Sequence, residues 1–153
     1  MANISEFYGS VTFDFTKTNL KPKKISKIMD TICGYFYKEK GEYYTEMYFE
    51  DIEKEDLKNG IINIGYDGCG KWSFPNNVEW FVTDKEILNE ILPQCCGLAI
   101  VFEYCDAEEG GNFIVMNAKI KVKYGINKGT IEQLDDGEVY EYTKENYDNI
   151  FLG

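Results

Sequence analysis

The chain of 153 residues contains no histidine and no arginine. Histidine is the side chain whose ordinary pKa lies near neutrality, so its absence removes the commonest general base and the commonest metal ligand. Without arginine, no planar guanidinium can hold a phosphate or a carboxylate through two hydrogen bonds. The missing residue types disfavour most catalytic sites, and we expect a protein that is not an enzyme.

Paired cysteines and long apolar segments are also missing. The five cysteines are odd in number, and the closest two, Cys95 and Cys96, are adjacent, a spacing that rarely forms a structural disulfide. The chain has no Cys-x-x-Cys pair of the kind that binds zinc. It has neither a secretory leader after Met1 nor an apolar stretch long enough to cross a bilayer. We therefore expect free thiols, no cofactor or metal, and a cytoplasmic protein of a host cell.

Negative charge is what the chain has in excess. Its 27 acidic residues outnumber its 16 lysines and leave a formal net charge of −11. Nucleic acids and anionic membranes are captured by clustered cations, so this charge disfavours direct binding to either of them. The expected partner is a basic protein surface, such as that of a nucleic-acid-binding host protein.

Apolar residues at alternate positions predict strands, and apolar residues at helical spacing predict helices. Strands are predicted over residues 9–16, 43–50, 98–102 and 112–124, and a further strand opens at Ile61. One helix is predicted after Pro22, and a second between a capping box at Thr83 and the helix-ending Pro93. The acidic segment 51–60 is predicted to be turn-like.

The order of these elements predicts an α+β fold. It is a ferredoxin-like split βαβ sheet with two helices on one face, plus an extra C-terminal hairpin strand and a tail. We expect a single domain over residues 1–153, in which residues 125–153 are an acidic C-terminal extension with one more strand near residues 139–142. The hairpin strand carries Lys119, Lys121 and Lys123, which we expect to protect an exposed sheet edge.

Two segments superficially match ligand-binding motifs. Residues 65–71 match a phosphate-binding loop up to the position where a hydroxyl must bind Mg²⁺, which is Trp72 here, and no helix is predicted to follow. Residues 106–111 place acids before a glycine as a calcium loop does, but Asn117 stands where a bidentate glutamate is needed. We interpret both segments as turns.

The acidic residues fall in three clusters, near residues 46–56, 103–109 and 135–145, with tyrosines between them. The simplest explanation is solubility, which an excess of acids favours in any protein. The alternative is that the carboxylates mimic a phosphate backbone, while the tyrosines supply contact area of the kind found at interface hot spots. The predicted partner-binding residues are Glu50, Asp51, Glu53, Glu55, Asp56, Tyr104, Asp106, Glu108, Glu109, Asp135, Asp136, Glu138, Tyr140 and Glu141.

The second half of the chain carries a distinctive motif. It consists of Lys71-Trp72-Ser73-Phe74-Pro75, the strand at residues 98–104, and the glycines Gly110 and Gly111 before Phe113. In these residues the chain resembles the YubB ferredoxin-like family, which comprises small proteins of plasmids, phages and bacteria. The resemblance implies a ferredoxin-like core and a mobile-element setting, and it brings no catalytic residue.

These observations favour a small acidic inhibitor that mimics nucleic acid. We expect it to occupy the basic nucleic-acid channel of a host defence protein, as an anti-CRISPR protein encoded by a phage or mobile element would. Two alternatives stay open. One is a small-ligand-binding domain that uses an aromatic cluster of Trp72, Phe74 and Trp80. The other is a carboxylate-based hydrolase, which needs an acid with a raised pKa beside an ionised one inside a cleft.

Overall fold

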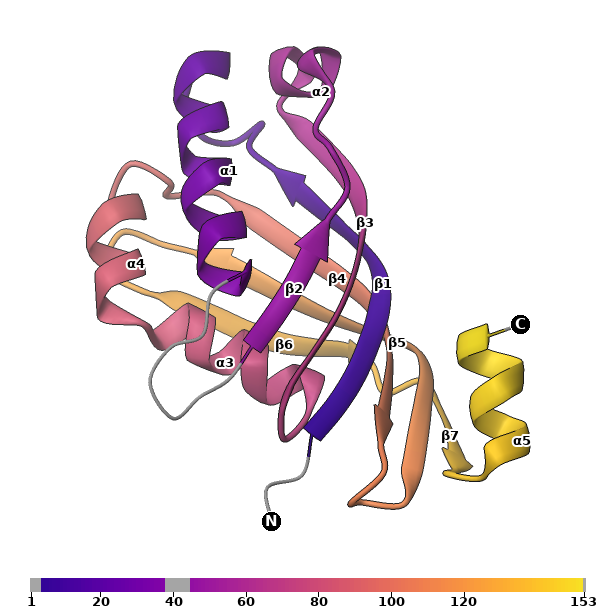
Figure 1. Cartoon of the computed structure of the whole chain (residues 1–153). Helices are drawn as coiled ribbons and strands as arrows, with labels where there is room; N and C mark the ends of the chain where they lie inside the picture. Colours follow the sequence, from indigo (N-terminus) through magenta and orange to yellow (C-terminus); the bar gives the residue numbers. More distant parts are fainter. Residues whose placement is uncertain (1–3, 38–44, 153) are drawn as a thin grey trace.

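One antiparallel sheet organises the computed structural model, which describes residues 4–37 and 45–152. In this part of the chain the sheet has seven strands: β1 (Ile4–Asp14), β2 (Thr45–Phe49), β3 (Ile61–Lys71), β4 (Ala99–Glu108), β5 (Phe113–Tyr124), β6 (Gly129–Asp135) and β7 (Glu138–Glu141). Their order is β2-β3-β1-β4-β5-β6, and β7 pairs with the first residues of β5 (Figure 1). The long strand β1 therefore lies inside the sheet, between β3 and β4.

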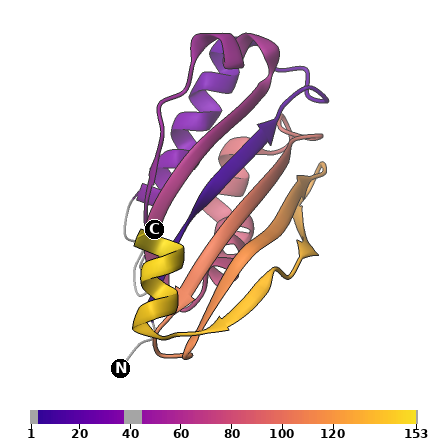
Figure 2. The ribbon, with the colours of Figure 1, turned by 90° about the vertical axis from the view of Figure 1, so that its right-hand side faces the viewer.

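Helices cover the two faces of the sheet unequally. The described helices are α1 (Pro22–Tyr37), α2 (Lys54–Asn59), α3 (Phe74–Thr83), α4 (Lys85–Ile91) and α5 (Lys144–Tyr147), which continues as a π-helical turn, η1 (Asp148–Leu152). Helices α1, α3 and α4 lie over one face, whereas α5 and η1, together the C-terminal helical segment, lie against part of the other (Figures 1 and 2). None of the helices in the described ranges is both long and apolar enough to cross a membrane.

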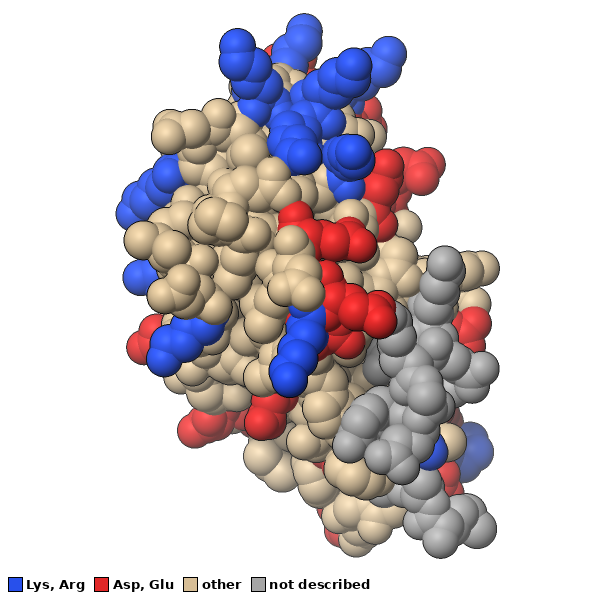
Figure 3. Space-filling model, turned by 90° about the vertical axis from the view of Figure 1, so that its left-hand side faces the viewer, with Lys and Arg blue, Asp and Glu red and all other residues tan. Residues whose placement is uncertain are grey.

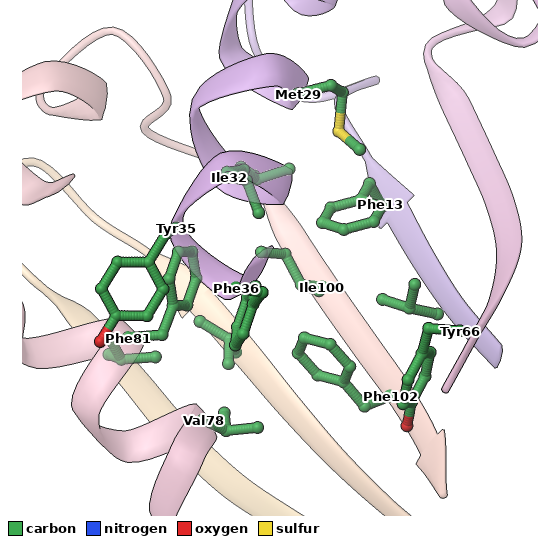
Figure 4. Packing of buried hydrophobic residues seen from close by; sticks show 14 of the residues in the cluster. Phe13, Met29, Ile32, Tyr35, Phe36, Tyr66, Val78, Phe81, Ile100 and Phe102 are labelled. Carbon is green, nitrogen blue, oxygen red and sulfur yellow. The ribbon is translucent and has the colours of Figure 1, made fainter. Parts of the chain in front are cut away.

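The hydrophobic core fills the space between the sheet and the helices α1 and α3. Helix α1 buries Ile25, Met29, Ile32 and Phe36, which recur at helical spacing. The ring of Phe36 lies 4.7 Å from that of Phe81 on α3 and 6.2 Å from that of Phe102 on β4, measured between centroids (Figure 4). Packing of this apolar face, more than helix propensity, holds α1 in place.

The structure confirms the α+β class and several predicted elements. The predicted first helix is α1, and the predicted strand at residues 112–124 is β5. The strand near residues 139–142 is β7, one residue earlier than predicted. Of the predicted strand at residues 43–50, residues 45–49 form β2, while Tyr43 and Tyr44 lie outside the described residues. The sheet is larger than predicted, because β6 joins it.

The predicted turn at residues 65–71 is wrong, because these residues form the second half of β3. Glycine is needed there for close packing rather than for a turn. A Cβ atom on Gly70 would lie 2.5 Å from Oδ1 of Asn77, and one on Gly68 would lie 2.2 Å from the carbonyl oxygen of Glu46. The turn was predicted because this segment is rich in glycine. Glycines within a strand can instead mark places where another part of the protein packs closely against the backbone.

The predicted second helix is α4, and a further helix, α3, precedes it. Helix α3 was not predicted, although Phe74, Val78 and Phe81 bury one of its faces. The next helix, α4, begins one residue later than predicted, because Asp84 rather than Thr83 is its N-cap and accepts a hydrogen bond from the Ile87 N–H at 3.0 Å. The acidic segment after β2 also contains a helix, α2, where a turn was predicted.

The role predicted for Lys119, Lys121 and Lys123 is wrong. Strand β5 is not an edge, because it pairs with β4 on one side and with β6 and β7 on the other. Strand β6 was not predicted because it carries no apolar alternation, and six of its seven residues are exposed. Lys119 instead forms an ion pair with Glu103 of β4, with 3.1 Å between Nζ and Oε1.

Truncating the core is expected to destabilise the fold. Phe102 is fully buried, and its ring contacts Phe36, Tyr66 and Phe74. The substitution Phe102→Ala is expected to lower the free energy of unfolding by about 3–5 kcal/mol in urea denaturation. The control Val139→Ala, at a site that is 68% exposed, is expected to change it by less than about 0.5 kcal/mol. Equal effects of the two substitutions would contradict this core.

Candidate functional site

The face of the sheet opposite α1 and α3, the open face, carries polar residues in cross-strand rows. One row across β2, β3 and β1 is Glu46, Cys69 and Glu6, and the next row is Tyr48, Asp67 and Tyr8. Directly opposed residues of antiparallel strands have Cβ atoms about 4.5–5.5 Å apart. The register therefore gathers three carboxylates, two tyrosine rings and a thiol in one small area.

The C-terminal helical segment forms a wall beside these rows (Figure 2). The Tyr8 hydroxyl donates a hydrogen bond to the carbonyl oxygen of Ile150 at 2.7 Å, and the Tyr8 ring meets that of Phe151 edge-on, with 4.9 Å between centroids. Tyr147 stacks on Phe151 with 5.1 Å between centroids, and its hydroxyl donates to Oε2 of Glu6 at 2.6 Å. These contacts attach the end of the chain to β1.

The two cross-strand rows form the floor of a groove, and the C-terminal helical segment forms its wall. The groove has a volume of about 700 Å³. We call it the acidic groove and define it by the carboxylates of Glu6, Glu46 and Asp67, the Cys69 thiol, and the rings of Tyr8, Tyr48, Tyr147 and Phe151. A volume of this size is typical of ligand sites in proteins. Its carboxylates lie beside apolar side chains that also line it, namely Ile4, Phe7 and Leu152.

The tyrosine hydroxyls of the acidic groove stay protonated at neutral pH. The hydrogen bond to Glu46 is the main cause that raises the pKa of Tyr48 to about 12, and burial is the main cause that raises the pKa of Tyr8 to about 12. The hydrogen bond to Glu6 also holds the pKa of Tyr147 well above its ordinary value. The phenol rings of the groove are therefore neutral.

Carboxylates beside aromatic rings favour an organic cation. Ring faces attract ammonium and guanidinium groups, and carboxylates add charge-assisted hydrogen bonds. Within residues 4–37 and 45–152, no group of three or more acidic or cysteine side chains is arranged to hold a metal ion. The acidic groove is thus suited to a lysine or arginine side chain, or to a small amine.

The fold brings together the second and third predicted acidic clusters. Phe113, at the start of β5, pairs with Glu108 on β4 and with Glu141 on β7. The exposed acids of these clusters that were predicted to bind a partner are Glu109, Asp135, Asp136, Glu138 and Glu141. They lie along the turn after β4 and along β6 and β7, at the side of the sheet away from β2.

The first predicted acidic cluster lies elsewhere. Glu50 follows β2, the strand at the opposite side of the sheet from β6, and its carboxylate accepts a hydrogen bond from the Gly65 N–H. Glu55 and Asp56 occupy the first turn of α2, where they interact favourably with the helix dipole, and Asp51 and Glu53 are exposed just before it. The three clusters therefore do not form one surface.

Two acids of the predicted site are not solvent-facing turn residues as predicted. Asp106 and Glu108 belong to β4 and are only 2% and 8% exposed. Oδ2 of Asp106 accepts a hydrogen bond from the Phe74 N–H at 2.9 Å, at the start of α3. Burial is the main cause that raises the pKa of Asp106 to about 7. A hydrolase needs such an acid inside a cleft, and Asp106 is instead enclosed in the protein.

The two predicted tyrosines differ in exposure. Tyr104 is buried, and its hydroxyl accepts a hydrogen bond from Nε2 of Gln133 at 3.2 Å. Tyr140 is half exposed on β7, and its hydroxyl donates to Oε2 of Glu138 at 2.6 Å. Only Tyr140 therefore offers ring area to a partner.

The predicted aromatic ligand cluster does not line one cavity. Phe74 is fully buried, and its ring lies 5.4 Å from Phe102 and 4.9 Å from Phe7 between centroids. Trp72 is 47% exposed and meets Trp80 edge-on at 5.5 Å. Phe74 thus belongs to the core, and the two tryptophans form a separate pair.

Sequence reasoning missed most of the acidic groove. Glu6 and Tyr8 precede the predicted first strand, and Asp67 fell in a predicted turn. One signal in the sequence could have revealed Glu6 and Tyr8. The alternation of apolar and polar side chains along β1 extends back to Glu6, and it places Glu6, Tyr8 and Ser10 on one face of the strand. The contribution of the C-terminal helical segment had no comparable signal, because it depends on tertiary contacts.

Comparisons of the chain with protein-family models, with curated proteins and with solved structures found no match.

The buried Asp106 is expected to make stability depend on pH. Its folded-state pKa of about 7 lies above the ordinary 3.8, so between these values the folded protein holds a proton that the unfolded chain releases. The free energy of unfolding therefore falls as pH rises through this window. Asp106→Asn keeps an acceptor for the Phe74 N–H and removes the ionisation. Relative to the wild type, this variant is expected to gain up to about 1.4 kcal/mol per pH unit across the window.

Urea denaturation of both proteins in a pH series measures this difference. The gap between the two curves should open between about pH 4 and pH 7 and stay constant above it. Parallel curves across the whole series would show that Asp106 is not protonated in the folded protein.

Proposed function

We propose that this chain is an acidic, non-enzymatic protein that binds a basic protein surface and takes the place of nucleic acid there. In its concrete form it is an inhibitor of a nucleic-acid-binding defence protein, such as a CRISPR effector, made by a phage or mobile element and acting in the host cytosol. The net charge of −11 supports this proposal, because charge complementarity speeds association and fixes orientation.

The acidic groove is the observation that carries the proposal. It places Glu6, Glu46 and Asp67 within one hollow on the open face, with aromatic rings beside them. A lysine or arginine side chain that enters this groove gains both carboxylate contacts and ring faces. Anchoring side chains that fill such pockets dominate the energy of many interfaces.

Exposed acids outside the groove supply the long-range field. Asp135, Asp136, Glu138 and Glu141 lie along β6 and β7, and Tyr140 offers ring area beside them. Rim charges of this kind change association rates and salt dependence more than they change the lifetime of a complex. We propose that the groove provides most of the affinity for the partner, whereas these acids increase the rate of association. The buried Asp106 and Glu108 are not part of the proposed contact surface.

We also propose that strands β1 to β4 form a ferredoxin-like unit. Their order in the sheet is β2-β3-β1-β4, with α1 connecting β1 to β2 and with α3 and α4 connecting β3 to β4. Two such interleaved crossovers are the split βαβ arrangement. Strands β5, β6 and β7 extend this unit, and a mobile-element origin agrees with the resemblance of residues 71–75 and 98–104 to the YubB family.

A small organic amine is a second candidate for the acidic groove. The volume of about 700 Å³ supports this alternative, because it would hold a free ligand as well as a side chain. Native mass spectrometry of the purified protein distinguishes the two proposals. A copurified amine of constant mass would favour the small ligand, and its absence together with complex formation would favour the protein partner.

Neutralising the groove is expected to weaken binding of cationic peptides. The probe is a fluorescein-labelled peptide of alternating arginine and glycine, and affinity is measured by fluorescence anisotropy. The triple substitution Glu6→Gln, Glu46→Gln and Asp67→Asn removes the charges and keeps one acceptor oxygen on each side chain. At about 0.5 kcal/mol for each lost charge contact, it should reduce the affinity about tenfold.

The matched control is Glu53→Gln, Glu55→Gln and Asp56→Asn near α2. Both variants change the net charge from −11 to −8, so they differ only in where the charge is removed. The control should lose less than about threefold in affinity at physiological salt, because screening limits distant charges. Equal losses would mean that the peptide reports bulk charge, and the groove would then carry no function.

A further inference from the structure

Six lysines gather at the end of the molecule where α1 begins. Five of them, Lys17, Lys21, Lys23, Lys24 and Lys27, lie within one stretch of sequence, and residues 15–29 include no acid. The sixth, Lys58, is near the end of α2. We call these six residues the lysine patch. Figure 3 shows lysines gathered at this end of the molecule, with acids beside and below them.

Three segments are held together to form the lysine patch. The Phe15 N–H donates a hydrogen bond to the carbonyl oxygen of Gly60 at 2.7 Å, which fixes the end of α2 beside the loop after β1. Helix α1 buries Ile25, Ile28 and Met29 against the sheet, so its lysines face outward. All of the patch lysines are exposed except Lys24, which is half-buried.

The lysine patch is only partly neutralised in the isolated protein, where Asp14 at its border interacts electrostatically with Lys17. None of its lysines forms an ion pair with any other residue that the structure describes. Lys23 and Lys24 also occupy the first turn of α1, which contains no acid, and the helix dipole disfavours positive charge there. Bound anions would relieve both the mutual repulsion of the lysines and their clash with the dipole.

We propose that the lysine patch binds the phosphate backbone of a nucleic acid without reading its sequence. Lysine acts as a point charge on phosphate, and phosphate contacts position a protein without conveying base identity. The net charge of −11 argues against such binding only for the chain as a whole. At physiological ionic strength, charges more than about 8–10 Å apart are largely screened. The local excess of lysines, rather than the net charge, therefore determines whether a phosphate is attracted to this surface.

A nucleic acid fits this surface better than an anionic membrane does. Helices that lie in a membrane interface insert an apolar face between the lipids. The apolar face of α1 is already used, because Met29, Ile32 and Phe36 are fully buried against the sheet. The side chains between the patch lysines include the polar Thr18, Asn19 and Ser26, and only Leu20 and Pro22 among the apolar ones there are not buried. This inference does not rest on the proposed function, because it uses other residues at another place on the protein.

Fluorescence anisotropy of the full chain with labelled single-stranded RNA, over a salt series, tests the proposal. Over a series that starts at about 0.1 M salt, where distant acids are largely screened, binding should be strongest at the lowest salt. Log affinity should then fall linearly with log salt, by about 0.7 for each phosphate neutralised. The variant Lys21→Ala, Lys23→Ala and Lys27→Ala removes three exposed patch lysines. It should reduce the low-salt affinity about tenfold or more and the salt slope by about 2.

The matched control is Lys85→Ala, Lys123→Ala and Lys128→Ala, which removes three exposed lysines outside the patch. Each triple variant shifts the net charge from −11 to −14, so equal losses in the two would overturn the proposal. A smaller variant, Lys17→Ala and Lys58→Ala, should weaken binding in the same direction, and thermal denaturation checks that all three variants are folded. Binding to vesicles of anionic lipid without binding to RNA, or no RNA binding at low salt, would also overturn it.

Discussion

The alternation of side chains along β1 is the constraint on which the rest of the structure depends. Because β1 pairs on both sides over almost its whole length, its register fixes the register of β3 and β4. A shift by one residue would send Phe7, Val11 and Phe13 to the open face and would bury Glu6 and Tyr8. The core and the acidic groove are therefore two faces of the same strand pairing.

Elements with a strong apolar period were predictable from the sequence, and those without one were not. Helix α1 and strand β5 carry such periods and were found close to their observed bounds. Strand β6 is almost entirely polar, and its place in the sheet depends on its pairing with β5. Of the turn predicted at residues 106–111, residues 109–111 are a turn, whereas residues 106–108 belong to β4. That part of the prediction was wrong because buried acids are rare, so the acidic composition favoured an exposed turn.

Charge is distributed unevenly in this protein, and the net value conceals it. The lysine patch lies where α1 begins, and the acidic groove lies on the open face beside the C-terminal helical segment. The net charge describes the molecule as a single point charge. That description holds only at distances well beyond the screening length. At contact distance the two surfaces present opposite signs, and the two proposals together would let one chain contact both the protein and the nucleic acid of a nucleoprotein.

The wall of the acidic groove is held by a small set of contacts, chiefly those of Tyr8 with Ile150 and Phe151 and that of Tyr147 with Glu6. A cation that touches both this wall and the strands is linked thermodynamically to the docking of the C-terminal helical segment. Tighter docking then raises affinity for the cation, and bound cation strengthens docking by the same factor. In the proposed function, the C-terminal helical segment would thereby control the affinity of a site whose charges lie on β1, β2 and β3.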